Sequence, residues 1–225
     1  MFTFFLLAHL VADFALQPLW LVERKKRWDG LLIHGGIVFG CMLAIGLLEA
    51  RALALWPAML AIAAAHTVTD WWKVNYGARV PGSPIVAFLL DQAIHLATLV
   101  LALGLALPPQ IAWSLDSTAA ARPALLASAA VLALLATPIA VMVWLDPKFA
   151  HVALAGRART GAFVLAGAAL ALALYGGSAT LPLALLGVVV RSEPACSAHP
   201  LDQPRGALTV ALVAASIGAL LRALT

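Results

Sequence analysis

Long apolar segments, each about the length of one membrane crossing, dominate this 225-residue sequence. A helix needs ~20 mostly apolar residues to cross the ~30 Å hydrocarbon core of a bilayer. Such segments occur at about residues 2–22, 30–48, 53–76, 84–106, 121–145, 161–190 and 206–224. Because 64% of the residues are hydrophobic and 11% are charged, a soluble domain of this size could not bury all of its apolar residues. The sequence therefore predicts an all-α fold, a polytopic transmembrane helix bundle.

The number of helices depends on residues 161–190, an apolar segment that is long for one straight crossing. Gly176 and Gly177 lie inside it and fit either one kinked helix or a hairpin of two short helices. We therefore expect about seven helices, within a range of six to eight.

Polar motifs are confined to the first part of the chain, which suggests two parts. Residues 1–106 are predicted to form a four-helix membrane core that carries the motifs. Residues 107–225 are predicted to form further membrane helices, to which the sequence assigns no role.

Basic residues are distributed unevenly between alternate loops, and this bias predicts the orientation of a membrane protein. With the N-terminus outside, the cytoplasmic side carries Arg24, Lys25, Lys26, Arg27, Lys73, Arg79, Lys148, Arg157 and Arg159. Up to residue 160, only Arg51 and Arg122 then lie in the opposite loops. We therefore expect the N-terminus outside. The first segment is expected to remain as a helix, because it lacks the positively charged start of a signal peptide.

The lipid bilayer is the expected partner. Indole rings anchor proteins in the headgroup layer, and the predicted cytoplasmic helix ends carry Trp20, Trp28, Trp71 and Trp72. The formal net charge of +4 does not indicate nucleic-acid binding, because the basic residues form short clusters between apolar segments.

Polar side chains interrupt the first four apolar segments, although each is costly to place in hydrocarbon. They are His9, Asp13, Gln17, His34, His66, Asp70, Asp91, Gln92 and His95. Three His/Asp pairs share a spacing of four residues: His9 with Asp13, His66 with Asp70, and Asp91 with His95. Residues four apart lie on one face of a helix, so each pair points in one direction.

The three pairs also match in depth. The first and third helices are predicted to run inward, and in both the His comes before the Asp. The fourth runs outward, and its Asp comes before its His. In all three helices the Asp therefore lies nearer the cytoplasmic end than the His. At ~1.5 Å per residue, the aspartates lie ~9–14 Å from the cytoplasmic helix ends, the paired histidines ~15–20 Å, and Gln17 and His34 ~6–8 Å. We expect three aspartates and four histidines to meet in the cytoplasmic half of the bundle.

A cluster of carboxylates and imidazoles in a poorly hydrated bundle needs a compensating positive charge. A divalent metal cation supplies it, and this set of ligands suits zinc, manganese or iron. Their number leaves room for a second ion or for side chains that orient the ligands. The predicted metal ligands are His9, Asp13, His34, His66, Asp70, Asp91 and His95.

Two polar neighbours belong to the candidate site. Gln17, four residues after Asp13, is expected either to orient a ligand or substrate or to form an interhelical hydrogen bond. Lys73, three residues after Asp70, is expected to contribute to the site, to pair with that carboxylate or to extend toward water.

These motifs resemble the DUF3307 family of bacterial membrane proteins, which has no assigned function. The resemblance covers about the first 100 residues and rests on HLVADFALQ (9–17), ERKKR (23–27), His34, HTVTDWWK (66–73) and FLLDQAIH (88–95). It implies a multi-pass protein of the bacterial inner membrane. More distantly, the pattern is similar to membrane-bound proteins described as metal-dependent hydrolases, which implies a metal-bound water as nucleophile.

The leading hypothesis is a metal-dependent hydrolase that acts on an ester or phosphoester of a lipid or of a membrane-proximal small molecule. Asp70 is its predicted general base, with Lys73 and Gln17 beside it. An ion or proton transporter is an alternative, although the outer halves of the helices lack polar residues. Haem ligation by paired histidines and a non-enzymatic role in membrane assembly are the others.

The charge bias gives the first testable prediction. A reporter fused after residue 28 or 78 should report the cytoplasm, and one fused after residue 50 or 115 the opposite side, because basic loops stay inside. Paired alkaline phosphatase and fluorescent protein fusions measure this. If the fusions after residues 50 and 78 report the same side, the predicted third helix does not cross the membrane.

Overall fold

The computed structural model describes residues 1–113, 120–147, 156–191 and 199–224, which are helical with short turns and contain no strand. The chain divides into two compact units, Met1–Ser128 and Ala129–Thr225. This division lies later in the chain than residue 106, where the predicted first part ends. The prediction followed the position of the polar motifs, whereas the two units are distinguished by how the backbone packs. Lys148, part of the predicted charge bias, lies outside the described residues.

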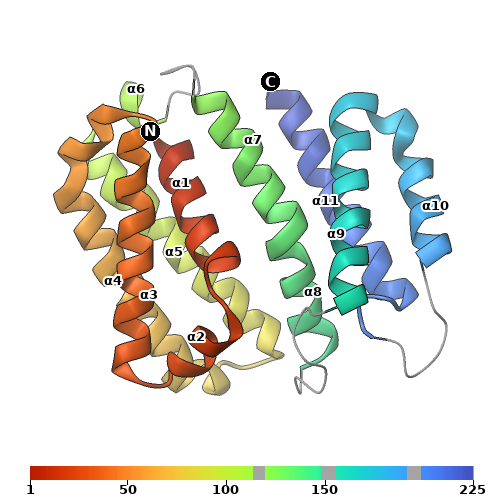
Figure 1. Ribbon diagram of the computed structural model, residues 1–225, viewed down its shortest axis with the longest axis horizontal. Coiled ribbons are helices and arrows are strands. Elements are labelled where there is room, and N and C mark those ends of the chain that lie inside the picture. Colours follow the sequence, from red (N-terminus) through yellow and green to blue (C-terminus); the bar gives the residue numbers. More distant parts are fainter. Residues whose placement is uncertain (114–119, 148–155, 192–198, 225) are drawn as a thin grey trace. The chain divides into compact units, whose positions relative to one another are not determined.

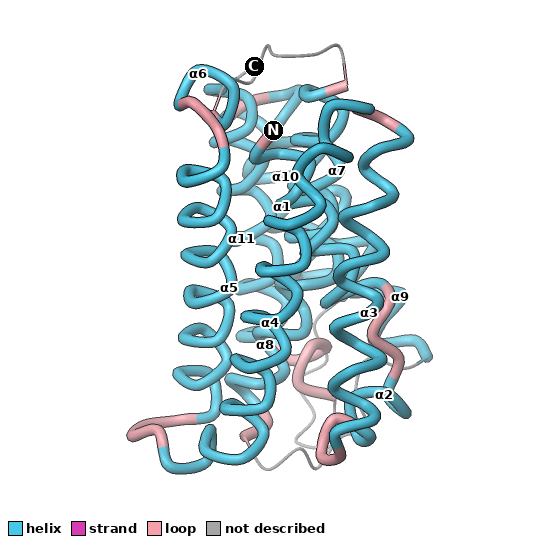
Figure 2. The backbone as a smooth tube through the Cα atoms, turned by 90° about the vertical axis from the view of Figure 1, so that its left-hand side faces the viewer, coloured by secondary structure: helices cyan, strands magenta, loops and turns pink. Residues whose placement is uncertain are grey.

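The first unit is built on a ring of helices that contact one another in turn (Figures 1 and 2). Its elements are α1 (Phe2–Leu10) with the π-helical segment Val11–Ala15, α2 (Leu19–Arg24), α3 (Trp28–Ala44), α4 (Trp56–Tyr76), α5 (Pro84–Ala106), α6 (Pro109–Ala112) and the start of α7 (Ala121–Val131). Short 3-10 turns cover Ile45–Leu47, Ala50–Leu55 and Gly77–Arg79. Helix α1 contacts α3 and α5, while α4 contacts α3 and α5, which closes the ring.

Each ring helix buries one stripe of side chains and exposes the rest. In α5 the buried stripe is Ala87, Asp91, His95, Leu99 and Leu103, one residue every four. Toward the Met1 end, the buried stripes form an apolar core that includes Phe4, Phe5, Val38, Met42, Met59, Ile62, Leu99 and Leu103. Large apolar side chains also cover the outside of the ring helices, as expected for surfaces that face lipid.

The first apolar segment differs from the expected continuous helix over residues 2–22. The helix ends at Ala15, and α2 begins after a turn at Leu16–Pro18, in which Pro18 has an extended backbone. Proline disfavours a helical conformation at the residue before it, which explains the break. Helix Phe2–Ala15 is therefore only ~21 Å long at ~1.5 Å per residue.

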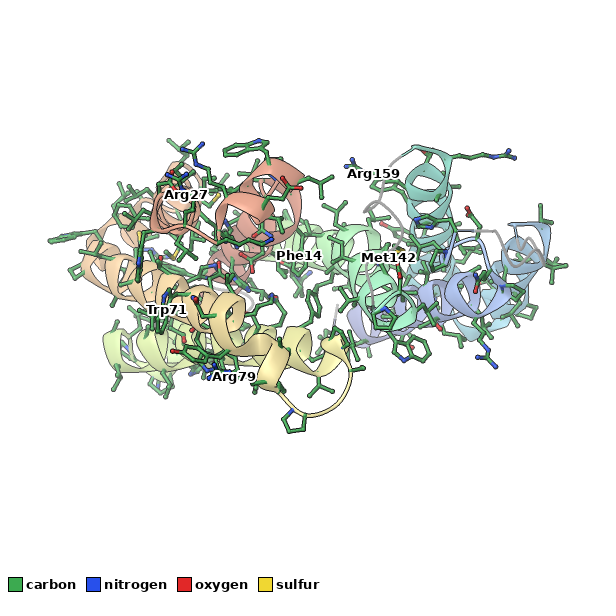
Figure 3. All side chains as sticks on the ribbon, turned by 90° about the horizontal axis from the view of Figure 1, so that it is seen from below. Phe14, Arg27, Trp71, Arg79, Met142 and Arg159 are labelled. Carbon is green, nitrogen blue, oxygen red and sulfur yellow. The ribbon has the colours of Figure 1, made fainter. Side chains whose placement is uncertain are left out.

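Charged groups lie at the two ends of this unit. Arg27, Trp71 and Arg79 surround the end seen in Figure 3, where Trp28 stacks on Trp71 with ring centroids 6.1 Å apart. In the loop at the other end, the Arg51 side chain donates hydrogen bonds to Glu49 at 2.8 and 3.0 Å. These bonds lower the pKa of the Glu49 carboxyl and offset the one basic charge of that loop.

The second unit resolves the segment 161–190 as a helical hairpin. It contains the end of α7, a π-helical segment (Leu132–Ala136), α8 (Thr137–Leu145), α9 (Gly156–Ala171) with its π-helical continuation Leu172–Gly176, the turn Ser178–Thr180, α10 (Leu181–Arg191) and α11 (Pro204–Leu224). Gly177, with a φ of +71°, makes the turn between α9 and α10.

Among the described residues, six helices are long and apolar enough to cross a membrane: Trp28–Leu47, Ala50–Arg79, Pro84–Ala106, Ala121–Leu145, Gly156–Gly176 and Pro204–Leu224. Phe2–Ala15 is a shorter apolar helix and is not among these six. The predicted fold class, an all-α polytopic helix bundle, is therefore confirmed, and the six spans lie within the predicted range of six to eight helices.

Close packing of α11 on α9 gives the second prediction. A Cβ at Gly218 of α11 would lie 2.5 Å from the carbonyl oxygen of Leu170 in α9, so Gly218→Ala should lower the free energy of unfolding by ~1–3 kcal/mol. Thermal unfolding in detergent measures it. Gly40→Ala is the matched control, because nothing lies within 4 Å of a Cβ there. Equal stabilities of the two variants would contradict this packing.

Candidate metal centre

The buried polar side chains of the ring helices meet inside the first unit. Helix α1 with its π-helical segment contributes His9 and Asp13, α3 contributes His34, α4 contributes His66 and Asp70, and α5 contributes Asp91 and His95. Asp13, the most exposed of them, has a side chain only 8% exposed. All seven predicted ligands therefore face one another across the bundle.

Asp13 lies in the middle of the π-helical segment. The Leu16 amide donates to the Val11 carbonyl at 2.9 Å, five residues back, so the turn is wider than in an α-helix. Such segments are rare and often occur at functional sites. This turn places both carboxylate oxygens of Asp13 among histidines.

Three atoms form a tight triangle on one side of Asp13. His34 Nε2 lies 3.1 Å from Asp13 Oδ1 and 3.0 Å from His66 Nε2, and His66 Nε2 lies 3.3 Å from Asp13 Oδ1. Ligands of a tetrahedral zinc, at ~2.0–2.1 Å from the metal, are ~3.3 Å apart. The triangle therefore has the size of one face of a metal coordination sphere.

A fourth ligand atom lies close to the same triangle. Asp70 Oδ2 is 3.5 Å from His34 Nε2 and 3.6 Å from His66 Nε2. His34, His66 and Asp70 each offer an atom within 4.8 Å of the others, as a metal site requires.

The other oxygen of Asp13 faces a second pair of histidines. Asp13 Oδ2 lies 3.9 Å from His9 Nε2 and 3.8 Å from His95 Nδ1. His9, Asp13, His66 and His95 form another group of atoms within 4.8 Å, and Asp70, Asp91 and His95 form a third. The rings of His66 and His95 stack with centroids 3.9 Å apart, so packing fixes their orientation.

Two lysines neutralise two of the three carboxylates. Lys25 Nζ donates to Asp70 Oδ2 at 2.6 Å and to Gln17 Oε1 at 2.5 Å, while Lys73 Nζ donates to Asp91 Oδ2 at 2.7 Å. Among the described residues, the polar contacts of Asp13 are with imidazoles and, at 3.4 Å, with the Gln92 amide. With neutral histidines, the cluster therefore keeps one net negative charge.

The two catalytic neighbours predicted from sequence occupy different surroundings from those expected. Gln17 follows the end of the helix and does not continue the stripe of Asp13. It reaches the cluster through Lys25. Lys73 pairs with Asp91 rather than with Asp70, because α4 and α5 lie side by side.

Lys25 and Gln92 have roles in the cluster that the sequence pattern did not predict. Lys25 was counted only among the orientation charges, yet its side chain is 7% exposed. One signal was available in the sequence: Lys25 comes four residues after the apolar Leu21, so the two side chains share one face of the helix. Gln92 donates to Asp91 at 3.1 Å and to Asp13 at 3.4 Å, so it joins two carboxylates.

Fold and site together define a multi-pass membrane protein with a buried His/Asp cluster that could hold metal ions. The chain belongs to the family described as "Protein of unknown function (DUF3307)", whose model matches residues 1–122. Every residue of the cluster lies within this match. Comparisons with curated proteins and with solved structures found no match.

The buried ion pair of Lys25 and Asp70 gives the third prediction. Lys25→Met should lower the free energy of unfolding by ~3–5 kcal/mol, because it leaves a buried carboxylate without its cation. Chemical or thermal unfolding measures it. Lys26→Met is the matched control and should change stability by only ~0.5 kcal/mol, since Lys26 is exposed.

A double variant separates the ion pair from lost packing. Lys25→Met with Asp70→Asn should recover much of the stability, because the uncompensated charge is removed. Equal losses in the single and double variants would contradict the charge explanation.

Proposed function

We propose that this protein is a membrane-embedded metal-dependent hydrolase. The triangle of Asp13 Oδ1, His34 Nε2 and His66 Nε2, with edges of 3.0 to 3.3 Å, carries the proposal. Two imidazole nitrogens 3.0 Å apart can share one hydrogen bond, and beside a carboxylate oxygen the same three atoms can together bind a cation. Zinc, manganese or iron suits these ligands.

Three protein ligands leave a coordination position for water or substrate. A divalent cation there activates a water and polarises an ester or phosphoester. Asp70 is the proposed general base, because its Oδ2 lies within 3.6 Å of both histidine nitrogens of the triangle. Lys25 orients this carboxylate, and Gln17 in turn holds Lys25.

The proposed substrate is a lipid or a membrane-proximal small molecule that approaches from the basic end of the bundle. Lys73, whose side chain is 32% exposed, lies between the cluster and this end and is the proposed contact for an anionic group. We place the protein in the bacterial inner membrane with this end in the cytoplasm, as its basic residues favour.

Packing argues against the alternatives. A transporter needs a polar path across the bundle, but Phe4, Phe5, Met42, Met59 and Leu103 fill the half beyond the cluster. A haem held between two axial histidines needs space for its porphyrin plane, whereas the rings of His66 and His95 stack directly on each other with centroids 3.9 Å apart. An assembly role does not explain a buried cluster.

The fourth prediction tests the metal. Protein purified in detergent should contain at least one zinc, manganese or iron per chain by elemental analysis. Chelation should lower the melting temperature, and metal should restore it, because a ligand that binds only the native state stabilises by ~4 kcal/mol at 1,000 times its Kd.

His34→Ala should remove metal and hydrolysis of chromogenic esters or phosphoesters together. Asp29→Asn, which changes a carboxylate outside the cluster, is the control and should retain both. Purified protein that takes up no stoichiometric metal would rule out the hydrolase.

A further inference from the structure

The Asp13 carboxylate has two faces, and each faces a different pair of histidines. Oδ1 lies 3.1 and 3.3 Å from His34 and His66, whereas Oδ2 lies 3.9 and 3.8 Å from His9 and His95. A carboxylate with ligands on both sides is suited to bridge two metal ions. One cation on the Oδ1 side leaves the second pair of histidines without a role.

Unpartnered buried atoms mark the second side. His95 is 2% exposed, and neither of its ring nitrogens has a hydrogen-bond partner. Asp91 is fully buried, and its Oδ1 has no partner either. Native proteins rarely bury such groups unsatisfied, and an ion is one explanation when they do.

The distances on the second side accommodate a cation. His95 Nδ1 lies 3.8 Å from Asp13 Oδ2 and 3.9 Å from Asp91 Oδ2. Two atoms that are each bound to one metal ion at ~2.0–2.2 Å can lie up to ~4.4 Å apart, so His95 Nδ1 can share a cation with either carboxylate.

We propose that the cluster binds two divalent cations bridged by Asp13, and that its substrate is a phosphate monoester. Asp13, His34 and His66 hold the first ion, with Asp70 beside it. Asp13, His9, His95 and Asp91 hold the second. The proposal rests on the proposed function, because both ions share Asp13. Paired ions ~3.5–4 Å apart are typical of enzymes that cleave phosphate esters.

Charge selects the substrate class. With neutral histidines, three aspartates and two lysines give the cluster one net negative charge, and two divalent cations would change this to three positive charges. A phosphate dianion balances most of that charge, whereas a carboxylic ester does not. Water would supply the oxygen that bonds to phosphorus while the P–O ester bond breaks. One water proton ends on the alcohol and the other on the phosphate, with Asp70 as the relay.

Metal stoichiometry tests the second ion. Titration of metal-free protein with Mn²⁺ should reach two ions per chain, and electron paramagnetic resonance should show an exchange-coupled pair. His95→Gln and Asp91→Asn should each bind one ion and give the six-line spectrum of isolated Mn²⁺. Asp29→Asn, the control outside the cluster, should bind two. Size-exclusion chromatography confirms that the variants are folded.

The outcomes separate the two proposals. One ion per chain in the parent protein, unchanged in His95→Gln, would overturn the second site and leave the hydrolase standing. No bound ion would overturn both. Because the titration of the parent protein counts the ions directly, a variant that fails to fold does not affect the result.

Three probes test the substrate class. Inorganic phosphate should bind the Mn²⁺-loaded protein and not the metal-free protein. Hydrolysis of p-nitrophenyl phosphate alone indicates a soluble monoester, while release of phosphate from phosphatidic acid vesicles indicates a lipid headgroup. Cleavage of p-nitrophenyl butyrate without phosphate binding would overturn the phosphate class. Phosphate binding without hydrolysis of any ester would support the anion site and overturn the hydrolase.

Discussion

The buried charge of Asp13 is the constraint on which the first unit depends. Its carboxylate lies among four imidazoles in a bundle interior, where an uncompensated charge is costly. The other two buried carboxylates are compensated by lysines. Lys25, at the end of α2, pairs with Asp70, and Lys73 of α4 pairs with Asp91. Together with the imidazoles around Asp13, these two ion pairs join all the ring helices, so the polar cluster contributes to how the helices pack.

Much of this arrangement could be predicted from sequence, because a spacing of four residues places a polar pair on one face of any helix. His66 with Asp70 and Asp91 with His95 lie on unbroken helices, and both pairs face the cluster as expected. The pattern failed at Gln17, because a stripe continues only as long as the helix does. Pro18 was the available sign that the helix ends before it.

Lys25 shows a second limit of sequence analysis. In a run of four basic residues, charge bias treats all members alike. Only the tertiary structure distinguishes Lys25, which is buried against Asp70, from the exposed Lys26. A partner 45 residues away leaves no local pattern, and the one local sign is the apolar Leu21, four residues earlier on the same helix face. The second unit lacked motifs altogether, and its close contact of Gly218 with α9 follows from small residues rather than from polar ones.

The early end of the first helix explains how the cluster is closed. A continuous helix over residues 2–22 would have carried Lys25 past the end of the bundle into solvent. The break at Leu16–Pro18 instead lets α2 turn back against α3 and bring Lys25 under Asp70. On the opposite side, the apolar core around Phe4, Met42 and Leu103 excludes water. The cluster is therefore bounded by apolar side chains on one side and by the ion pairs of Lys25 and Lys73 on the other, a setting in which electrostatic interactions are strong.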